Sequence, residues 1–288
     1  MSNQRSEIVI AVLGAGGKMG CRITDNLRKT DYQLLLCEQA ENGIARISER
    51  GLSIMPNDEA LAVADYIILA VPDAVIGPLS EKIVSQLKSG ATVILLDPAA
   101  AYARQVALRD DCTFVVTHPC HPALFEEQDS PEARKDMFGG IAAKQDIVIA
   151  LQQGSEEKFD IAEQICIRMF APVTQCHRIT VEHMALLEPA AAEVVAAAAA
   201  CIMKEAMDEV IRMGVPEAAA RSFMLGHIQI PLAIAFNNVN PFSDAAKIAI
   251  NYGYDKIFKP DWKQVFTKES LDEVLRLMLH LDEKPALK

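Results

Sequence analysis

The stretch that decides the fold is IVIAVLGAGGKMGCRITDNLRK, residues 8–29. Its first six residues are apolar and end at a glycine, which is typical of a buried parallel strand. After the glycines, Met19, Ile23 and Leu27 fall on one face at helical spacing, so we expect a helix over Lys18–Lys29. A strand joined to a helix by a glycine-rich turn predicts the start of a βαβ series.

The turn itself has glycines at positions 14, 17 and 20, a GxxGxxG variant of the dinucleotide-binding loop. Such a loop needs a tight turn, a backbone that can touch a pyrophosphate, and a helix N-terminus directed at negative charge. Glycine turns are common as purely structural features, but this one follows a buried strand and opens an amphipathic helix. We therefore predict that a dinucleotide contacts Gly14, Ala15, Gly16, Gly17, Lys18 and Met19.

Glu38 ends the second predicted strand and supplies the next cofactor signal. A carboxylate at this point can accept hydrogen bonds from the ribose diol of NAD and repels the 2′-phosphate of NADP. We therefore expect NAD, although Arg46 could bind a phosphate and Glu38 could instead be a solvated charge. Val71 and Pro72 follow the next strand and are expected to shape the cofactor crevice.

The rest of the chain divides into two compositional halves. Strands are expected at residues 32–37, 66–71, 92–96 and 113–117, with helical segments between them, and this alternation predicts a doubly wound Rossmann-type parallel sheet. A run at 147–151 extends the sheet before a helix at 156–169. From Thr180 to Gly214 no strand signal remains, and the segment is expected to form one long helix.

These patterns predict an α/β domain over residues 1–175 and an all-helical domain over residues 176–288. The long helix is rich in alanine and has few large side chains to enclose a core, so we expect the helical domain to form a homodimer.

The composition excludes several classes of partner. The chain has 28 Lys and Arg against 39 Asp and Glu, a net charge of −11. Nucleic acids and anionic membranes require a basic surface, so we expect neither as a main partner. No run reaches the roughly 18 unbroken apolar residues of a membrane span, and residues 1–7 show no signal peptide. The 7 cysteines include no CxxC pair, which favours reduced thiols and a cytoplasmic location.

His118 is the first candidate for chemistry, because it directly follows a strand at the edge where open α/β sheets bind ligands. It stands in the run Thr117-His118-Pro119-Cys120-His121-Pro122, whose prolines hold both imidazoles in an extended turn. An imidazole can act as a general acid or base or as a metal ligand. His121 has a weaker claim, and Cys120 is expected to be a small buried hydrophobe.

Glu188 is the second candidate. It lies in an apolar part of the long helix, directly before Pro189, which is expected to kink the helix. A carboxylate there is costly unless it meets a partner, a substrate or a metal; a salt-bridged structural role is the alternative. His183 lies about 140° around the helix from Glu188 and is left out of the site.

Taken together, these segments resemble the 6-phosphogluconate-dehydrogenase-like superfamily of two-domain dehydrogenases. Within it, the chain is most similar to enzymes that oxidise and isomerise the branched sugar acid D-apionate. The motifs that carry this resemblance are GAGGKMG at 14–20, ILAVPD at 68–73, VTHPCHP at 116–122, FGGIAAKQDIV at 138–148, TVEHMALLEPA at 180–190, MGVPEAAARSFMLGH at 213–227 and FSDAAKIAI at 242–250.

The resemblance implies NAD-dependent oxidation of D-apionate, coupled to isomerisation, with 3-oxo-isoapionate as the product. Migration onto the new carbonyl requires that this carbonyl be polarised and the neighbouring hydroxyl deprotonated, which a divalent metal could achieve. His118 and Glu188, one from each predicted domain, would then be its ligands. Zinc is favoured over magnesium, because the sequence lacks a dense carboxylate cluster.

Two alternatives stay open. A simple 3-hydroxyacid or prephenate-like dehydrogenase would use His118 on a substrate hydroxyl and need no metal. A non-catalytic NAD-sensing protein would need neither His118 nor Glu188.

Overall fold

The computed structural model describes residues 8–237 and 239–282. The chain forms two compact units, one of residues 8–185 with 272–282 and one of residues 186–271. The first unit thus extends beyond residue 175, where the sequence predicts the domain boundary, and it includes the end of the described chain.

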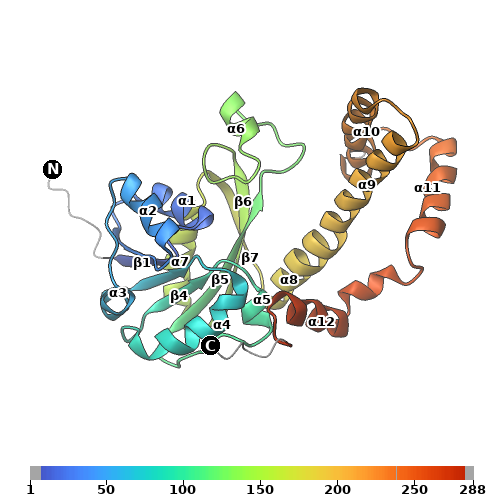
Figure 1. Cartoon of the computed structure of the whole chain (residues 1–288). Coiled ribbons are helices and arrows are strands. Elements are labelled where there is room, and N and C mark those ends of the chain that lie inside the picture. Colours follow the sequence, from blue (N-terminus) through green and yellow to red (C-terminus); the bar gives the residue numbers. More distant parts are fainter. Residues whose placement is uncertain (1–7, 238, 283–288) are drawn as a thin grey trace. The chain divides into compact units, whose positions relative to one another are not determined.

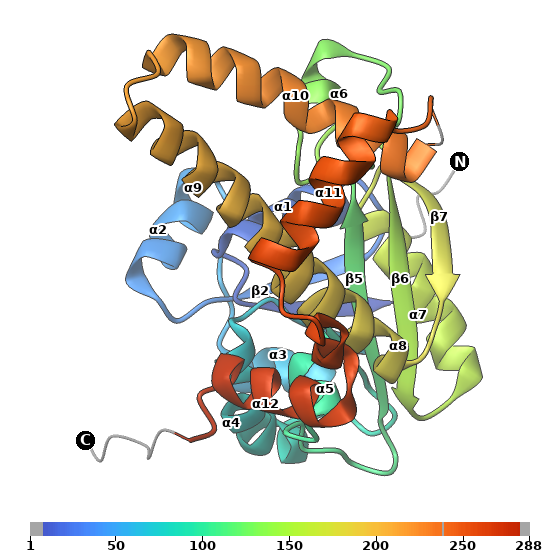
Figure 2. The same cartoon turned by 90° about the vertical axis from the view of Figure 1, so that its right-hand side faces the viewer.

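One seven-stranded sheet organises the first unit, in the order β2-β1-β3-β4-β5-β6-β7 (Figure 1). All neighbouring strands pair in parallel except β5 and β6, which are antiparallel; in Figure 2, β5 and β7 point in opposite directions. The strands are β1 (Val9–Leu13), β2 (Gln33–Cys37), β3 (Tyr66–Leu69), β4 (Thr92–Leu95), β5 (Thr113–His121), β6 (Gln145–Gln153) and β7 (Val173–Arg178).

The sheet is therefore doubly wound and mostly parallel, but its last two strands are reversed. A parallel neighbour to β5 would require a crossover that returns the chain to the starting edge of the sheet. Residues 122–144 instead form an excursion that contains the short helix α6 (Pro131–Lys135), and β6 begins beside the end of β5. The sequence pattern does not predict β7, because four of its six residues are polar or charged.

The main core lies between the sheet and two helices, α1 (Lys18–Leu27) and α7 (Glu156–Met169). Ile23 and Leu27 of α1 are fully buried there, as the helical spacing predicts. Other helices of this unit are α2 (Glu41–Glu49), α3 (Asn57–Val63), α4 (Asp73–Ile83), the 3-10 turn η1 (Val84–Gln86), α5 (Ala99–Tyr102) and α8 (Val181–Ala185), and α12 (Lys268–Met278) spans its second boundary.

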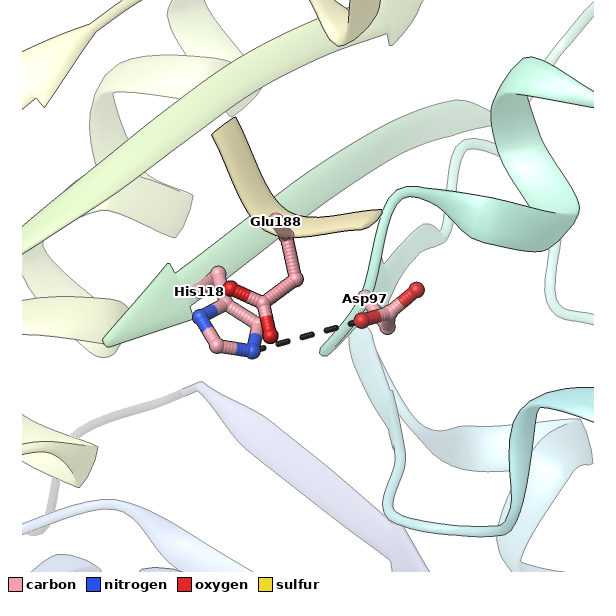
Figure 3. A group of neighbouring side chains, drawn as sticks. All are labelled: Asp97, His118 and Glu188. Carbon is pink, nitrogen blue, oxygen red and sulfur yellow. Dashed lines mark ion pairs between the residues drawn. The ribbon is translucent and has the colours of Figure 1, made fainter. Parts of the chain in front are cut away.

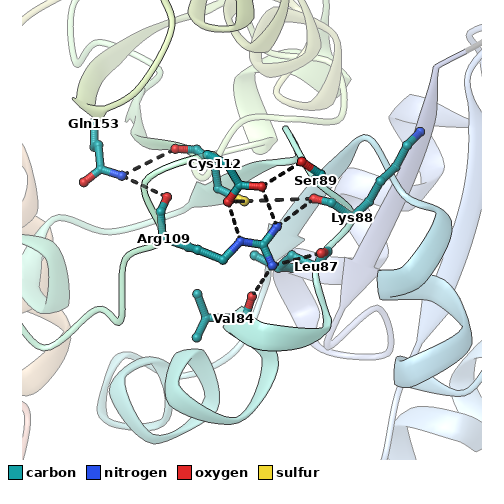
Figure 4. A network of polar contacts seen from close by, with 8 residues as sticks. Val84, Leu87, Lys88, Ser89, Arg109, Cys112 and Gln153 are labelled. Atoms are coloured by element: carbon teal, nitrogen blue, oxygen red, sulfur yellow. Dashed lines mark hydrogen bonds and ion pairs between the residues drawn. The ribbon is translucent and has the colours of Figure 1, made fainter.

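Arg109 lies just before β5 and connects the loops that lead into the N-terminal ends of β4 and β5 (Figure 4). Its guanidinium donates to the carbonyls of Val84, Leu87 and Lys88 at 2.8, 3.0 and 3.1 Å. It also pairs with Asp111 at 2.5 Å, and this hydrogen bond lowers the pKa of Asp111 to about 2. Because His118 lies toward the opposite end of β5, this network is structural.

The second unit is entirely helical over its described residues. A continuous helix runs over Val181–Arg212, as the sequence predicts. Around Pro189, where a kink is expected, the helix has the wider π form, which leaves room for a residue without an N–H donor. Its parts are α8, the π-helix η2 (Leu186–Ala197) and α9 (Ala198–Arg212), followed by α10 (Glu217–Asn237), α11 (Asp244–Ile257) and the 3-10 turn η3 (Trp262–Phe266).

Very little of this helical unit is buried. Among its described residues, the buried ones are Pro189, Ala190, Met207, Ala220 and Leu271. Two helices, Val181–Arg212 and Glu217–Phe236, are long and apolar enough to cross a membrane by length and composition, and only 11% and 6% of their most apolar windows is buried. Polar residues interrupt both helices, so neither contains the roughly 18 unbroken apolar residues by which a membrane span is recognised in the sequence.

Candidate active site

The glycine loop has the tight geometry that the sequence predicts. Gly14 adopts φ +81°, in the left-handed region that favours glycine. The N–H groups of Gly14 and Ala15 both donate to the Cys37 carbonyl, at 2.9 and 3.1 Å. A Cβ on Gly14 would stand 2.3 Å from the Ala70 carbonyl oxygen, so the turn is pressed against the neighbouring strand end. Burial raises the pKa of the Cys37 thiol to about 11, so this thiol stays neutral beside the loop.

Beyond this turn, the helix α1 presents its N-terminus. Gly17 is its N-cap and makes no side-chain capping bond, which leaves donors of the first turn for an anion. Gly16 packs against Gly43 so closely that a Cβ would lie 2.4 Å from the Gly43 carbonyl oxygen. Lys18 is exposed, whereas Met19 packs against the core.

Glu38 is built into this loop by backbone hydrogen bonds. Its Oε2 accepts from the Gly16 N–H at 3.0 Å, and its Oε1 accepts from the N–H groups of Gln39 and Ala40 at 2.8 and 2.9 Å. Arg46 donates from Nε to the Gly16 carbonyl at 2.7 Å. Glu38 and Arg46, the two side chains relevant to the choice between NAD and NADP, therefore both bind the backbone of Gly16. These hydrogen bonds fix the position of the Glu38 carboxylate at the edge of the loop.

A pocket of about 710 Å³ opens beside Glu38, within the first unit. Met55 lies on one side of it, and Val75 and Leu79 of α4 contribute apolar surface. These lining residues are absent from the sequence-based prediction, because pocket walls have no local motif. The predicted residues Val71 and Pro72 lie outside its lining: Pro72 caps α4, and Val71 Cγ1 is 3.1 Å from the position of a Cβ on Gly14.

His118 lies near the end of β5 with 16% of its side chain exposed. Its Nδ1 is 2.9 Å from the Pro119 carbonyl oxygen. Since a carbonyl can only accept, this contact assigns the hydrogen to Nδ1, and in the neutral ring Nε2 carries the lone pair. His118 Nε2 is directed toward Asp97 Oδ2 at 4.0 Å.

Asp97 is a further candidate for the site, and no sequence motif marks it. It follows β4, the strand beside β5, and its side chain is 15% exposed. Its Oδ1 accepts from the Ala99 N–H at 2.8 Å, which directs Oδ2 toward His118. The signal that could have identified it is its position: a carboxylate just after a parallel strand lies at the same sheet edge as the histidine after the next strand.

Glu188 joins these two side chains (Figure 3). Asp97, His118 and Glu188 each offer one ligand atom, and these atoms lie within 4.8 Å of one another. Glu188 lies three residues beyond α8, in the π-helical segment η2. One imidazole nitrogen and two carboxylate oxygens form a donor set that suits a divalent cation.

The other residues singled out in the sequence are placed differently. His121 belongs to β5 itself, and its ring centroid is 5.9 Å from that of His118. Cys120 is exposed, contrary to the expectation of a small buried hydrophobe, because it stands at an irregularity in the pairing of β5 with β6. His183 is exposed on α8 and is not part of the three-residue group.

Comparisons with known proteins cover nearly the whole chain. The family model described as phosphogluconate dehydrogenase (decarboxylating) C-term matches residues 126–279, and that described as NADP oxidoreductase coenzyme F420-dependent matches residues 9–100. A D-apionate oxidoisomerase from Pectobacterium atrosepticum is 45% identical, over 95% of this chain and 96% of its own length. Another, from Cupriavidus necator, is 46% identical over 93% of this chain and 98% of its own.

Among solved structures, a crystal structure described as a semialdehyde dehydrogenase NAD-binding protein from Cupriavidus necator, in complex with calcium and NAD, has the same fold. It superimposes with a TM-score of 0.92 at 45% identity, covering 95% of this chain and all of that one.

Proposed function

The chain belongs to the D-apionate oxidoisomerase family, and from this premise we propose that it oxidises D-apionate with NAD and isomerises the product to 3-oxo-isoapionate. The observation that carries the proposal is the near-full-length similarity to four such enzymes at 44–46% identity. The polar group of Asp97, His118 and Glu188 provides a place where this chemistry can occur.

NAD binding follows from the geometry of the loop. The N-terminus of α1 provides donors for the pyrophosphate, and Glu38 stands where it can accept from the ribose diol. The pocket beside Glu38, with its apolar wall from α4, has room for the adenine. The NAD in the crystal structure of the similar protein from Cupriavidus necator supports this assignment.

We also propose that Asp97, His118 and Glu188 hold a divalent metal. Their donor set fits, because Nε2 of the neutral His118 ring and two carboxylates converge within 4.8 Å. The imidazole favours zinc, while the second carboxylate, Asp97, makes the set more acceptable to magnesium or manganese than the sequence suggests. When bound, the metal would polarise the carbonyl and lower the pKa of the neighbouring hydroxyl.

The oxidation and the isomerisation each conserve atoms and electrons. In the oxidation, the carbinol C–H bond breaks and its hydride passes to the nicotinamide, while the hydroxyl proton is released to solvent. In the isomerisation, the neighbouring hydroxyl loses its proton and its carbon becomes the new carbonyl. The migrating group's C–C bond to that carbon breaks and a new C–C bond forms at the former carbonyl carbon. The former carbonyl oxygen gains a proton, so the atoms and electrons of the substrate are conserved. His118 keeps the same orientation throughout, because the Pro119 carbonyl holds its Nδ1–H.

Incubation with NAD and D-apionate tests the proposal, with NADH followed by absorbance and the product identified by NMR. NADH together with a rearranged carbon skeleton is the expected result. NADH with an unrearranged oxo acid would favour the simple dehydrogenase, and NAD binding without turnover would favour a sensor. Calorimetric titration of the chelator-treated protein with Zn²⁺, Mg²⁺ and Mn²⁺ tests the metal site without relying on activity.

We further propose that the chain forms a homodimer through its helical unit. Residues 186–271 bury too few side chains to form a core of their own. Large apolar side chains are exposed instead, with Phe223 at 61%, Ile230 at 57%, Phe236 at 77% and Tyr252 at 67%. A groove of about 560 Å³ runs along α10 beside Phe223 and Ile230. A second copy offers an apolar surface of the same kind, as symmetric dimers do.

Sedimentation at micromolar concentration tests the dimer. Replacing both Phe223 and Ile230 by aspartate should leave a monomer. The matched control Val63→Asp changes an exposed apolar residue of α3 in the first unit and should stay dimeric. A monomeric wild-type protein, or its partition into phosphatidylcholine vesicles, would contradict the proposal.

A cytoplasmic location fits the cysteine chemistry. All 7 cysteines lie among the described residues, and none of them forms a disulfide there. Burial raises the pKa of Cys176 to about 12 and also raises the pKa of Cys166, so these thiols stay protonated. A reducing compartment keeps such thiols free.

A further inference from the structure

His121 has a backbone conformation that few side chains adopt. Its φ is +61°, and apart from glycines the only other described residues with positive φ are Arg104, Asn240 and His280. A non-glycine residue in the left-handed region costs free energy, so the surrounding structure must hold it there. Of these four residues, His121 is the one whose ring contacts a member of the Asp97, His118 and Glu188 group.

An irregularity in the strand explains how the two imidazoles meet. Successive side chains of a strand point to opposite faces, so residues 118 and 121 would normally lie on opposite sides of the sheet. The register shifts between Pro119, which pairs with Ile147, and His121, which pairs with Asp146. This bulge turns His121 toward the face of His118, and the ring centroids lie 5.9 Å apart at 90°.

A hydrogen bond sets the orientation of the His121 ring. Its Nδ1 is 2.9 Å from the Phe138 carbonyl oxygen, and its ring stands edge-on to the Phe138 ring at 6.1 Å. Because the carbonyl accepts, Nδ1 carries the hydrogen and Nε2 of the neutral ring is an acceptor. His121 is partly exposed, so a bound ligand can reach it.

The segment that holds His121 is itself fixed to the predicted cofactor helix. The Arg22 guanidinium lies 5.4 Å from the centre of the Phe138 ring and donates to the Gly139 carbonyl at 3.3 Å. Asn26, also on α1, donates to the Gly140 carbonyl at 2.9 Å. His121 is thus positioned through residues 138–140 by α1, the helix whose N-terminus forms the phosphate loop.

We propose that His121 is a substrate-binding residue whose Nε2 accepts a hydrogen bond from a hydroxyl group of a polyhydroxy acid bound at Asp97, His118 and Glu188. The proposal rests on the proposed function and assigns to His121 the recognition of the substrate's hydroxyl-bearing carbons. A neutral nitrogen acceptor selects a hydroxyl over a carboxylate, which offers no hydrogen to donate.

Two substitutions separate this role from a structural one. His121→Asn tolerates the left-handed backbone and keeps an N–H donor near the position of Nδ1, but it removes the distal acceptor. His121→Gln places an amide oxygen near the position of Nε2 and restores the acceptor. His280→Asn is the matched control, because His280 is an exposed histidine that also has a positive φ, +54°, and is not part of the proposed site.

The measurements are kcat, KM and the equilibrium dissociation constant of D-apionate from the enzyme–NADH complex, together with NADH affinity and melting temperature. We expect His121→Asn to raise KM and the D-apionate dissociation constant about two- to tenfold, the value of one hydrogen bond. We expect kcat and NADH affinity to stay within about twofold, His121→Gln to recover part of the loss, and His280→Asn to resemble the wild type.

An unchanged KM in His121→Asn, with the wild type converting D-apionate, would overturn this inference and leave the proposed function intact. A loss confined to melting temperature, NADH affinity or kcat would also overturn it, because it would indicate a structural role. A wild-type enzyme that neither binds nor converts D-apionate would overturn the proposed function and this inference together.

Discussion

Replacing Gly20 by alanine tests whether the close approach of α1 to the first turn shapes the phosphate loop. A Cβ on Gly20 would stand 2.1 Å from the Gly14 carbonyl oxygen and 2.8 Å from Ala15 Cα. Ordinary van der Waals contact begins at 3.4 Å, so helix and turn must separate by about 1 Å in a closely packed region. Both obstructing atoms belong to the backbone, so no side chain can move aside.

The expected cost has two parts. Forcing a methyl group into this contact should destabilise the protein by about 1–3 kcal/mol, offset in part by the higher helix propensity of alanine, about 1 kcal/mol. The displacement also moves the N–H groups that face the pyrophosphate. A hydrogen bond to a charged group contributes about 1.5–3 kcal/mol, so the loss of one should weaken NADH binding about 10- to 100-fold.

Fluorescence titration with NADH and thermal unfolding measure the two effects. Gly253→Ala is the control: Gly253 also lies in a helix, α11, and its Cβ would meet nothing nearer than Ile257 Cδ1 at 4.0 Å. It should stabilise the protein by about 0.5–1 kcal/mol and leave NADH binding unchanged. If Gly20→Ala binds NADH as tightly as the wild type and melts no lower, the contact does not shape the loop.

Three further predictions concern charged side chains and the histidine of the site. Glu38→Ser should raise the use of NADP relative to NAD, measured as the ratio of kcat/KM values, because a carboxylate at the edge of the loop would repel the 2′-phosphate of NADP. Equal use of both cofactors by the wild type would contradict this role. His118→Ala and Glu188→Gln should each lower turnover at least ~10²-fold and leave NADH affinity unchanged. The double variant should lose far less activity than the product of the two single losses. Full activity with a lower melting temperature in Glu188→Gln would show that Glu188 is a structural carboxylate. The hydrogen bond to Arg109 lowers the pKa of Asp111 from 3.8 to about 2. The contribution of Asp111 to stability is therefore present above pH 3.8 and is lost as the pH falls toward 2. Acid should lower the melting temperature of the wild type more than that of Asp111→Asn.

The parts of the site that are local in sequence could be predicted from it. The strand–glycine–helix pattern of residues 8–29 predicts the phosphate loop, because each requirement is met by residues close together in the chain. Glu38 and His118 could be identified for a similar reason, since each stands at the carboxyl end of a predicted strand. The long helix follows from its composition, and the place of its irregularity follows from Pro189.

The sequence by itself therefore determined the strand–turn–helix of residues 8–29, the mostly parallel sheet and the long helix that follows it. Only the tertiary structure placed Asp97 against His118, reversed β6 beside β5, and turned His121 toward His118 through a bulge. These features depend on pairing between strands whose residues are far apart in the chain, and the side-chain pattern within one strand is the same whichever neighbour it pairs with. A shift of one residue in that pairing decides which face a side chain meets, so only the folded sheet shows that His121 shares a face with His118.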